Sequence, residues 1–346
     1  MDFSNNLINW YYKNKRDLPW RKTKDPYTIW VSEVILQQTR VDQGLDYYNR
    51  FLERFPNVQA LAEATEGDVL TIWKGLGYYS RARNMHVTAK YVVDNFGASF
   101  PSDYATLISL KGIGSYTAAA ISSICANEAQ AVVDGNVVRV LSRIFGYRDQ
   151  VGSTQSRNKV SKKAAQLIPQ DIPGDFNQAV MEFGAIHCKP VKPLCLDCIF
   201  LSDCFAFRNN LVEELPAKKR EIIRRSRYFN YLCVVIPDKG FVLGKRSEKD
   251  IWKNLWEFPL LESNKLLTKN EMQKSDLFID LPDAEIGEIA DYKHLLTHQV
   301  IHTRFFMVTS AQIPQEFIRR NNYIIDNPIA SGLPISRLTE RFLQKL

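Results

Sequence analysis

Four cysteines between residues 188 and 204 constrain this chain more than any other feature of its sequence. Cys188, Cys195, Cys198 and Cys204 have the spacing C-x6-C-x2-C-x5-C, and four thiolates this close in sequence can surround one soft metal centre. A zinc site usually pairs two C-x2-C turns, and this run has only one. Its wide first and last gaps therefore favour an iron–sulfur cubane, with zinc as the alternative.

The chain shows no signal for secretion or membrane insertion. Its N-terminus lacks an apolar run followed by small residues, and no stretch of about eighteen apolar residues occurs in the sequence. Cysteines gathered in one short run suit metal ligation in a reducing compartment better than disulfides. We therefore expect a cytoplasmic protein without a membrane partner. The net charge of +7 favours an acidic polymer as its partner.

Three stretches of different pattern divide the chain. Residues 1–214 repeat apolar positions at helical spacing, with a helix start predicted at Asp25 and Pro26. Residues 215–227 hold six basic residues and one acid after a proline, which predicts an exposed basic linker. Over residues 228–346 the apolar spacing changes to two, as in β-strands. The expected fold is an all-α region followed by an α+β domain.

The C-terminal region contains two candidate strand pairs. YFNYLCVVI and FVLGKR flank a PDKG turn over residues 228–246, and HLLTHQVIHTRFFMVT spans residues 294–309. Alternating apolar residues on both sides of a turn predict a β-hairpin in each case.

A glycine-containing turn lies between two helical runs in LKGIGSYTAAAI, residues 110–121. Gly112 and Gly114 allow a tight turn that presents backbone amides at a helix start, where a phosphate oxygen binds well. Lys111 adds a cation at the same turn. Because a G-x-G between helices is weak evidence by itself, an ordinary helix–helix turn is the alternative.

Two carboxylates have surroundings that predict opposite ionisation. Asp134 stands directly before a helix, whose N-terminal dipole should keep it charged, although the same position suits a simple N-cap. Glu33 has apolar neighbours in TIWVSEVILQQT, and burial there would raise its pKa toward that of a proton donor. One charged and one protonated carboxyl would match the two roles needed to cleave a glycosidic bond.

Longer motifs make the pattern specific. They are SEVILQQT (32–39), GLGYYSRARN (75–84), VVDGNVVRV (132–140) and FNQAVMEFGA (176–185), together with the glycine turn and the four cysteines. With these motifs the chain resembles the MutY adenine DNA glycosylases of the endonuclease III superfamily. The resemblance spans essentially the whole chain, because WKNLWEFPLLE (252–262) is similar to the second domain of that family.

The resemblance implies an architecture, a cofactor and a partner. Region 1–214 would be a helix-hairpin-helix catalytic region of two helical lobes, with a [4Fe-4S] cluster in the loop 188–204. Region 228–346 would be a Nudix-like lesion-recognition domain that lacks the metal-binding Nudix box. The partner would be double-stranded DNA with adenine opposite 8-oxoguanine, bound by a monomer. The turn residues Lys111, Gly112 and Gly114 would contact its backbone, although Lys111 stands where the family usually has proline.

The resemblance also implies roles for individual side chains. The glutamate matched by Glu33 protonates adenine N7 and then assists attack on the sugar by water. Asp134 would stabilise the oxocarbenium-like sugar, and Tyr116 and Asn136 match positions that support this aspartate. The family's adenine pocket is matched by Arg16, Leu18, Trp20, Arg21, Gln178 and Glu182. The residues that the family inserts into the base stack are matched by Gln38 and Tyr78. For each of these aromatic residues the alternative is core packing.

Two further positions bear on the reaction. The family reads 8-oxoguanine with Phe-Ser-His, which aligns with Leu296, Thr297 and His298, so the hydroxyl and the histidine are kept and the aromatic is lost. Endonuclease III relatives carry at position 116 a lysine that attacks the sugar and supports strand cleavage through a Schiff base. Tyr116 cannot form an imine, so a monofunctional glycosylase is expected.

Three rival functions remain open at this point. A bifunctional enzyme of the endonuclease III kind is opposed by Tyr116 and by the additional C-terminal domain. A sensor of DNA damage would bind through the cluster loop and the hairpin without removing a base. A Nudix phosphohydrolase is opposed by the missing acidic box.

Overall fold

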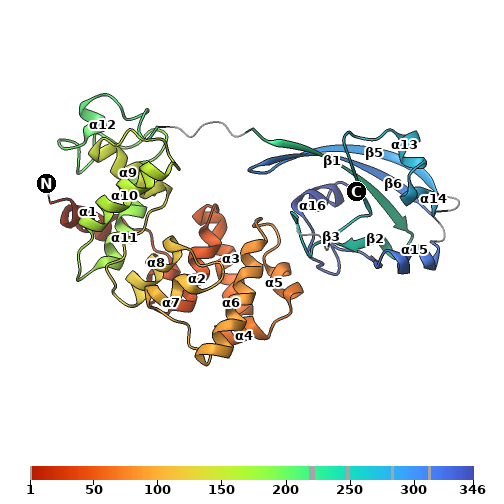
Figure 1. The fold of residues 1–346 in the computed structure, drawn as a ribbon, viewed down its shortest axis with the longest axis horizontal. Helices are drawn as coiled ribbons and strands as arrows, with labels where there is room; N and C mark the ends of the chain where they lie inside the picture. The colour runs from red at the N-terminus through yellow and green to blue at the C-terminus, as the bar shows by residue number, and fades with distance from the viewer. Residues whose placement is uncertain (1, 218–222, 247–249, 282–283, 311–312) are drawn as a thin grey trace. The chain divides into compact units, whose positions relative to one another are not determined.

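The structure is a computed structural model that describes residues 2–217, 223–246, 250–281, 284–310 and 313–346. The chain forms two compact units (Figure 1). The N-terminal unit comprises Met1–Ala64 and Asn84–Arg220, and the C-terminal unit comprises Thr65–Arg83 and Glu221–Leu346.

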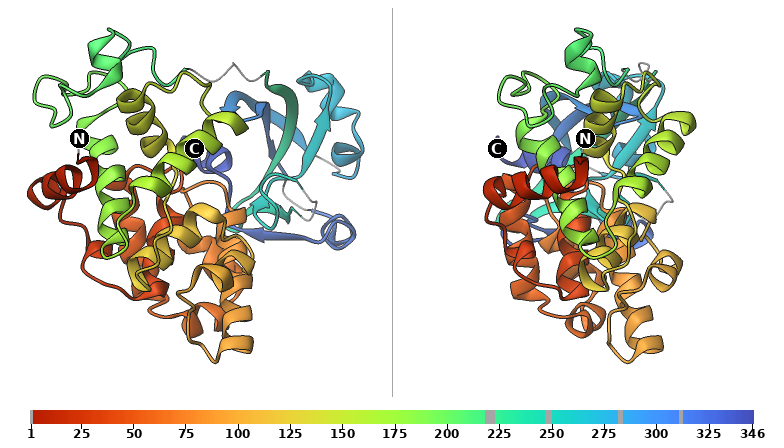
Figure 2. Two further views of the ribbon diagram at one scale, coloured as in Figure 1. Left: turned by 60° about the vertical axis from the view of Figure 1, so that its left-hand side comes forward. Right: turned by 90° about the vertical axis from the view of Figure 1, so that its left-hand side faces the viewer.

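The N-terminal unit is helical, as predicted, and its helices are drawn in red to green (Figures 1 and 2). Its first segment contains α1 (Phe3–Asn14), the 3-10 turn η1 (Pro19–Arg21), α2 (Pro26–Leu36), α3 (Val41–Arg54) and α4 (Val58–Glu63). The long helix α6 (Ser80–Phe96) begins in the C-terminal unit and continues in the N-terminal one. There follow α7 (Tyr104–Ser109), α8 (Ser115–Cys125), α9 (Gly135–Phe145), α10 (Thr154–Leu167), α11 (Pro173–Glu182), the π-helical turn η2 (Phe183–His187) and α12 (Phe205–Arg208).

Side-chain caps explain where two of these helices begin. Asp25 accepts a hydrogen bond from the Thr28 backbone N–H at 2.9 Å, and Pro26 occupies the first position of α2, which confirms the prediction. Asp134 caps α9 in the same way, with the Val137 N–H at 2.7 Å. Each cap satisfies a backbone donor that has no partner inside the helix, so local sequence determines both helix starts.

One apolar core joins the first and last parts of the N-terminal unit. Phe3 of α1 packs against Phe200 of the cysteine loop and Phe176 of α11, with ring centroids 4.8 and 6.4 Å apart. Phe200 is fully buried, and Cys188 and Cys198 pack against the same core. Burying a phenylalanine side chain contributes roughly 2–3 kcal/mol, so this core anchors the cysteine loop to the helices.

The predicted glycine turn joins α7 to α8. Gly112 has a φ of +80°, which residues with a Cβ rarely adopt, and a Cβ built there would lie 2.7 Å from the Cβ of Asn84. Gly114 has an ordinary φ of −94° and open space around it. The turn therefore requires glycine at position 112 but not at position 114.

The C-terminal unit contains a seven-stranded sheet. The strand order is β3 (Trp256–Glu257), β2 (Gly240–Lys245), β1 (Arg225–Ile236), β6 (Gln299–Thr309) and β5 (Glu285–Leu295), with β4 (Leu260–Ser263) paired to β1 and β7 (Tyr323–Asp326) paired to β2. The antiparallel pairs β1–β2 and β5–β6 confirm the two predicted hairpins, and β1 runs parallel to β6. The mixed sheet agrees with the expected α+β class.

Alternate residues of β1 supply two separate cores on the two faces of the sheet. Phe229 and Tyr231 belong to the core that contains α16 (Arg337–Leu343), whereas Leu232 belongs to the core that contains residues of α13 (Lys269–Gln273) and α15 (Gln315–Arg320). The remaining helices of the unit are α5 (Glu66–Ile72) and α14 (Asp276–Ile279). Because apolar cores lie on both of its faces, β1 is a continuous run of apolar residues from Tyr231 to Ile236.

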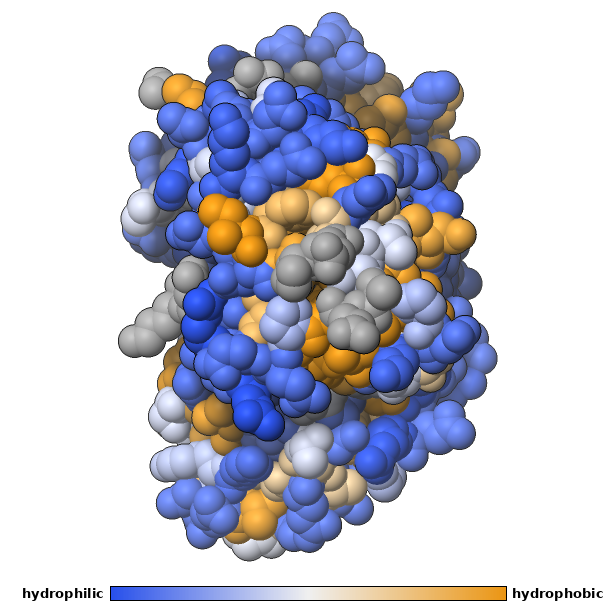
Figure 3. Space-filling model, turned by 90° about the vertical axis from the view of Figure 1, so that its right-hand side faces the viewer, coloured by the Kyte–Doolittle hydropathy of each residue, from blue (hydrophilic) through white to orange (hydrophobic). Residues whose placement is uncertain are grey.

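The surface is mainly hydrophilic on the face drawn in Figure 3, where apolar residues gather in patches. Exposed large apolar side chains of the C-terminal unit include Ile279 and Leu295. Within the described part of the chain, no helix has the length and apolar character needed to cross a membrane.

The expected linker over residues 215–227 ends earlier than predicted. β1 begins at Arg225, and residues 218–222 lie outside the described residues. Arg227 is only 8% exposed and donates to Asp250 and Glu262, each at 2.6 Å. These carboxylates lie far along the sequence, so the basic run alone could not reveal that one of its members is paired inside the sheet.

The segment Thr65–Arg83, which was expected within region 1–214, packs in the C-terminal unit instead. The hydroxyl of Tyr79 donates to the backbone oxygen of Ile335 at 3.2 Å, and Thr71 donates to that of Gly332 at 3.3 Å. Every residue has a backbone oxygen, so hydrogen bonds to backbone oxygens leave no pattern in the sequence. The place of Thr65–Arg83 in the C-terminal unit was therefore not predicted.

The close approach at Gly112 yields a stability prediction. Gly112→Ala should lower the free energy of unfolding by about 1–3 kcal/mol, because alanine meets both an unfavourable φ and the Asn84 side chain. Gly114→Ala is the matched control and should cost less than about 1 kcal/mol. Urea unfolding followed by circular dichroism measures both. Equal effects of the two substitutions would contradict the strain assigned to position 112.

Candidate active site

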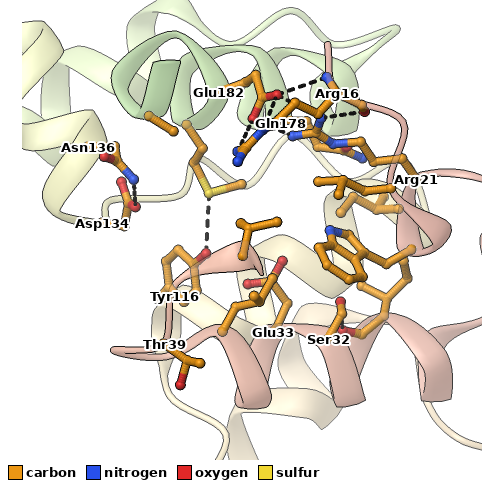
Figure 4. Close-up of a pocket in the computed structure, with 18 residues that line it drawn as sticks. Arg16, Arg21, Ser32, Glu33, Thr39, Tyr116, Asp134, Asn136, Gln178 and Glu182 are labelled. Carbon is orange, nitrogen blue, oxygen red and sulfur yellow. Dashed lines mark hydrogen bonds and ion pairs between the residues drawn. The ribbon is translucent and has the colours of Figure 1, made fainter. Parts of the chain in front are cut away.

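A pocket of about 790 Å³ opens in the N-terminal unit among η1, α2, α8, α9 and α11 (Figure 4). It is lined by all four predicted catalytic residues, Glu33, Tyr116, Asp134 and Asn136, and by all six predicted adenine-pocket residues, Arg16, Leu18, Trp20, Arg21, Gln178 and Glu182. Segments distant in the sequence therefore meet around one space.

Glu33 lies on α2 with its carboxyl directed into the pocket, and its exposed fraction is 9% (Figure 4). Its pKa is raised from 4.5 to about 7: burial is the main cause, hydrogen bonding with Tyr116 lowers the pKa, and the charge of the nearby Asp134 raises it. The prediction of a raised pKa is confirmed. Near neutral pH this group can both give and accept a proton.

Asp134 is held by hydrogen bonds at the start of α9. Its carboxylate accepts from the Val137 N–H at 2.7 Å and from Asn136 Nδ2 at 2.8 Å. Burial nevertheless raises its pKa above the usual value, because loss of water outweighs these hydrogen bonds. Burial therefore influences this pKa more than the hydrogen bonds at the start of α9 do, and the ionised state of Asp134 stays a prediction.

Tyr116 projects from α8 between the two carboxyl groups (Figure 4). Its hydroxyl donates to Met181 Sδ at 3.2 Å, and it also lies close enough to Glu33 to favour the charged carboxylate. Burial, followed by the charges of Glu33 and Asp134, raises the pKa of the phenol well above 10. Tyr116 therefore stays protonated and acts as a hydrogen-bond donor.

Glu182 forms the opposite wall of the pocket with two arginines. Arg16 and Arg21 donate to its carboxylate at 2.7 to 3.0 Å, and Glu182 is 1% exposed. Burial opposes ionisation of Glu182, but the hydrogen bonds from both arginines outweigh it and lower its pKa to about 2. Glu182 is a permanent anion whose position is set by two guanidinium groups.

Several lining residues were not predicted. They are Ile29, Ser32, Leu36, Thr39, Val41, Ile124, Met181 and Ala185. Ile29 and Leu36 lie four residues before and three after Glu33, so helical spacing could have placed them on its face. Met181 and Ile124 come from other helices, and no local signal marks them.

The remaining predicted residues lie outside this pocket. Gln38 follows α2 and Tyr78 precedes α6, and both are exposed with left-handed φ values of +62° and +48°. Within the C-terminal unit, the Tyr78 hydroxyl lies 2.6 Å from Thr297 Oγ1 in the turn between β5 and β6. His298 is exposed in the same turn. Strained backbone at exposed side chains is typical of residues that contact a ligand.

The four loop cysteines line another cavity in the N-terminal unit: Cys188, Cys195, Cys198 and Cys204. Arg143 Nη1 lies 3.5 Å from the sulfur of Cys188. Across residues 2–217 and the other described ranges, no three His, Cys, Asp or Glu side chains form a group that could hold a metal ion. Four thiols that line one cavity are the donor set of an iron–sulfur cluster or of a zinc site.

Arg139 connects the cysteine loop to the pocket. Its guanidinium donates to the backbone oxygens of Cys188 and Gly184 at 2.8 and 2.7 Å, and to Asn136 Oδ1 at 2.8 Å. Asn136 in turn donates to Asp134. The start of the cysteine loop therefore helps to hold Asp134.

Comparison with known families matches both units. Residues 31–170 match the HhH-GPD superfamily of base excision DNA repair proteins, and residues 231–345 match the NUDIX domain. Among solved structures, a thermostable thymine-DNA glycosylase has a TM-score of 0.54 and 28% identity, over 60% of this chain and 95% of that one. A non-covalent endonuclease III–DNA complex has a TM-score of 0.52 at 20% identity, over 60% of this chain and 94% of that one, which supports the fold.

The curated relatives that match most of this chain carry the same name. The adenine DNA glycosylase of Buchnera aphidicola subsp. Schizaphis graminum is 35% identical over 303 residues, which is 87% of this chain and 85% of that protein. The human adenine DNA glycosylase is 42% identical over 224 residues, which is 62% of this chain and 41% of the human protein. This chain therefore belongs to the adenine DNA glycosylases, hydrolases that remove adenine from DNA in base excision repair.

Proposed function

We propose that the chain excises adenine opposite 8-oxoguanine, or opposite guanine, in duplex DNA and leaves an abasic site without cutting the strand. One observation carries this proposal: Glu33, with a pKa of about 7, shares a pocket with the half-buried Asp134. Adenine must be flipped out of the duplex to reach such a pocket. One chain carries both the pocket and the turn at Thr297, which supports action as a monomer.

The two carboxyl groups suit acid-assisted hydrolysis. Protonated Glu33 gives its proton to adenine N7, and the bond between C1′ and N9 breaks with its electron pair passing to the base. The sugar becomes an oxocarbenium-like cation, which the negative charge of Asp134 stabilises. Water then adds its hydroxide to C1′ and its proton to Glu33, so the acid is restored and neutral adenine is released.

Position 116 supports the monofunctional part of the proposal. Strand cleavage by relatives that form a Schiff base requires an amine at the sugar. The residue that reaches toward Glu33 is Tyr116, a phenol that stays protonated, and the described lining of the pocket contains no lysine. Water is therefore the nucleophile that this pocket can use.

The wall opposite Glu33 suits recognition of the adenine edge. Glu182 is a fixed acceptor for the exocyclic amine, and Arg16 and Arg21 hold it in place. Gln178 adds an amide whose Oε1 accepts from Tyr11 at 2.7 Å. An exocyclic amine that enters the pocket would meet the negative charge of Glu182, so this arrangement favours adenine over a base without the amine.

Recognition of the opposite base is assigned to the C-terminal unit. Tyr78, Thr297 and His298 are exposed polar or aromatic groups, and the first two lie in hydrogen-bond contact. In the N-terminal unit, Lys111 and the amides beyond Gly112 and Gly114 start α8, an arrangement that suits a phosphate of the DNA backbone.

We also assign the cysteine cavity to a [4Fe-4S] cluster. The donor set is four thiols, and the arginines beside the loop, Arg139 and Arg143, would offset part of the negative charge that thiolates bring. When bound, the cluster fixes the course of the loop between residues 188 and 204. Its role here is structural.

Replacing the proton donor should stop catalysis without stopping binding. Glu33→Gln is expected to slow single-turnover excision of adenine opposite 8-oxoguanine at least 100-fold, because the amide cannot donate the proton. Its affinity for the duplex should change less than threefold. Alkali-treated samples measure abasic sites, and untreated samples measure direct strand breaks, which should be absent.

The surface variant Glu63→Gln is the matched control, because it makes the same chemical change at an exposed position. It should match the wild type in both rate and affinity. Loss of binding in Glu33→Gln would mean that Glu33 is structural. Strand breaks without alkali, or a covalent adduct after borohydride, would exclude the monofunctional mechanism, and wild-type binding without excision would indicate a sensor.

The raised pKa of Glu33 predicts how excision depends on pH. Only the protonated acid donates, and with a pKa of about 7 the protonated fraction falls nearly tenfold for each pH unit above that value. The single-turnover rate should therefore be highest near pH 6 and fall steadily from pH 7 to pH 9. Glu33→Gln should lack this fall. A wild-type rate that stays level across the range would exclude Glu33 as the acid.

The cluster assignment predicts the metal content. The purified chain should be brown and contain about four iron atoms per molecule. Cys198→Ala should lose the colour and most of the iron, whereas Cys125→Ala, which changes a cysteine outside the loop, should keep both. Elemental analysis and visible absorption measure this. A colourless chain with one zinc atom would overturn the assignment.

A further inference from the structure

A second cavity of about 780 Å³ adjoins the active-site pocket within the N-terminal unit. Arg21, Ile124 and Gln178 line both cavities, so their side chains form the wall between them. Glu33 and Asp134 line the first cavity and do not line the second. The second cavity therefore contains neither of the two carboxyl groups and shares only these three side chains with the active-site pocket.

The side chains of Arg21 and Gln178 in this wall are held by different partners, so one can move without the other. Arg21 is fixed by Glu182, whose oxygens it approaches to 3.0 and 2.8 Å. Gln178 is half-buried, and its side-chain oxygen accepts from the buried Tyr11 hydroxyl at 2.7 Å. Rotamer changes at such side chains are much faster than movements of whole helices. A rotation of Gln178 away from Tyr11 would widen the passage without disturbing the ion pairs of Glu182.

The chemistry of the second cavity suits a neutral, polar heterocycle. Its lining includes the donors and acceptors of Lys22, Thr23, Lys24, Asn127, Asp171 and Asp175. Opposite charges occur together, so no single sign of charge dominates the space. Free adenine is neutral and carries both donors and acceptors around its edge, and groups of this kind can hydrogen-bond to it.

If the chain excises adenine as proposed above, the free base must find a way out of the pocket, and the following inference rests on that function. After the C1′–N9 bond breaks, the abasic sugar and its strand still occupy the side from which the base entered. The free base must then wait for the DNA to leave or take another route. We propose that adenine leaves through the second cavity, passing the wall formed by Arg21, Ile124 and Gln178, while the abasic DNA is still bound.

Two variants test the route by filling the second cavity from different segments. Thr23→Trp lies on the loop before α2, and Asp171→Trp lies before α11; neither position lines the active-site pocket. Gln166→Trp is the matched control, because it adds the same bulk at an exposed position of α10 outside both cavities. All are made in the full chain.

Excess enzyme is mixed with a duplex that carries isotopically labelled adenine opposite 8-oxoguanine. At each time one sample is treated with alkali to count abasic sites, and another is passed through a size filter to separate free adenine from the protein–DNA complex. A competitor duplex in a parallel sample measures the rate at which DNA leaves.

In the wild type and Gln166→Trp, adenine should pass the filter as fast as abasic sites form and before the DNA dissociates. In Thr23→Trp and Asp171→Trp, abasic sites should form at the wild-type rate, while adenine release slows at least fivefold. Release at the wild-type rate from both filled variants would overturn the route. So would wild-type adenine that leaves only as fast as the DNA, a result that does not depend on any variant. Absence of abasic sites in the wild type would instead refute the proposed function.

Discussion

The active site depends on one constraint: the carboxyl group of Glu33 is kept out of water beside a second carboxylate. A shift in pKa from 4.5 to about 7 corresponds to roughly 3 kcal/mol against the charged form. Helix α2 imposes this cost, because it places Glu33 on the same face as Ile29 and Leu36. In the proposed mechanism, this apolar packing keeps the proton on Glu33 that drives bond cleavage.

Two glutamates in one pocket show how the surroundings divide chemical roles. Glu33 meets apolar side chains, Tyr116 and Asp134, and it titrates near neutrality. Glu182 is just as buried but meets two guanidinium groups, so its pKa falls to about 2 and it keeps its charge. A purine between them would face an exchangeable proton on one side and a fixed acceptor on the other. In the proposed function, one carboxyl group serves catalysis and the other serves recognition, and the two arginines beside Glu182 cause the difference.

Local chemistry was predictable from the sequence, whereas long-range pairing was not. The cap at Asp25, the turn at Gly112 and the raised pKa of Glu33 follow from residues close in the chain, and the structure agrees with all three. The rise in the pKa of Asp134 was not predicted, because its place before α9 is visible in the sequence and the depth of its burial is not. The ion pairs of Arg227 and the contribution of Met181 to the pocket depend on segments far apart in the sequence. The spacing of residues within one segment cannot predict such contacts.

The π-helical turn η2 occupies the five-residue interval between Glu182 of the pocket and Cys188 of the cysteine cavity. Glu182 precedes it and Cys188 follows it, and a Cβ added to Gly184 within it would lie 2.6 Å from the Cβ of Asn136. Each residue advances a helix by about 100°, so inserting or deleting one residue here would rotate Glu182 and Cys188 away from their separate cavities. The geometry therefore constrains the length of this interval more than the residue types within it. Gly184 is the exception, because a side chain there would meet Asn136.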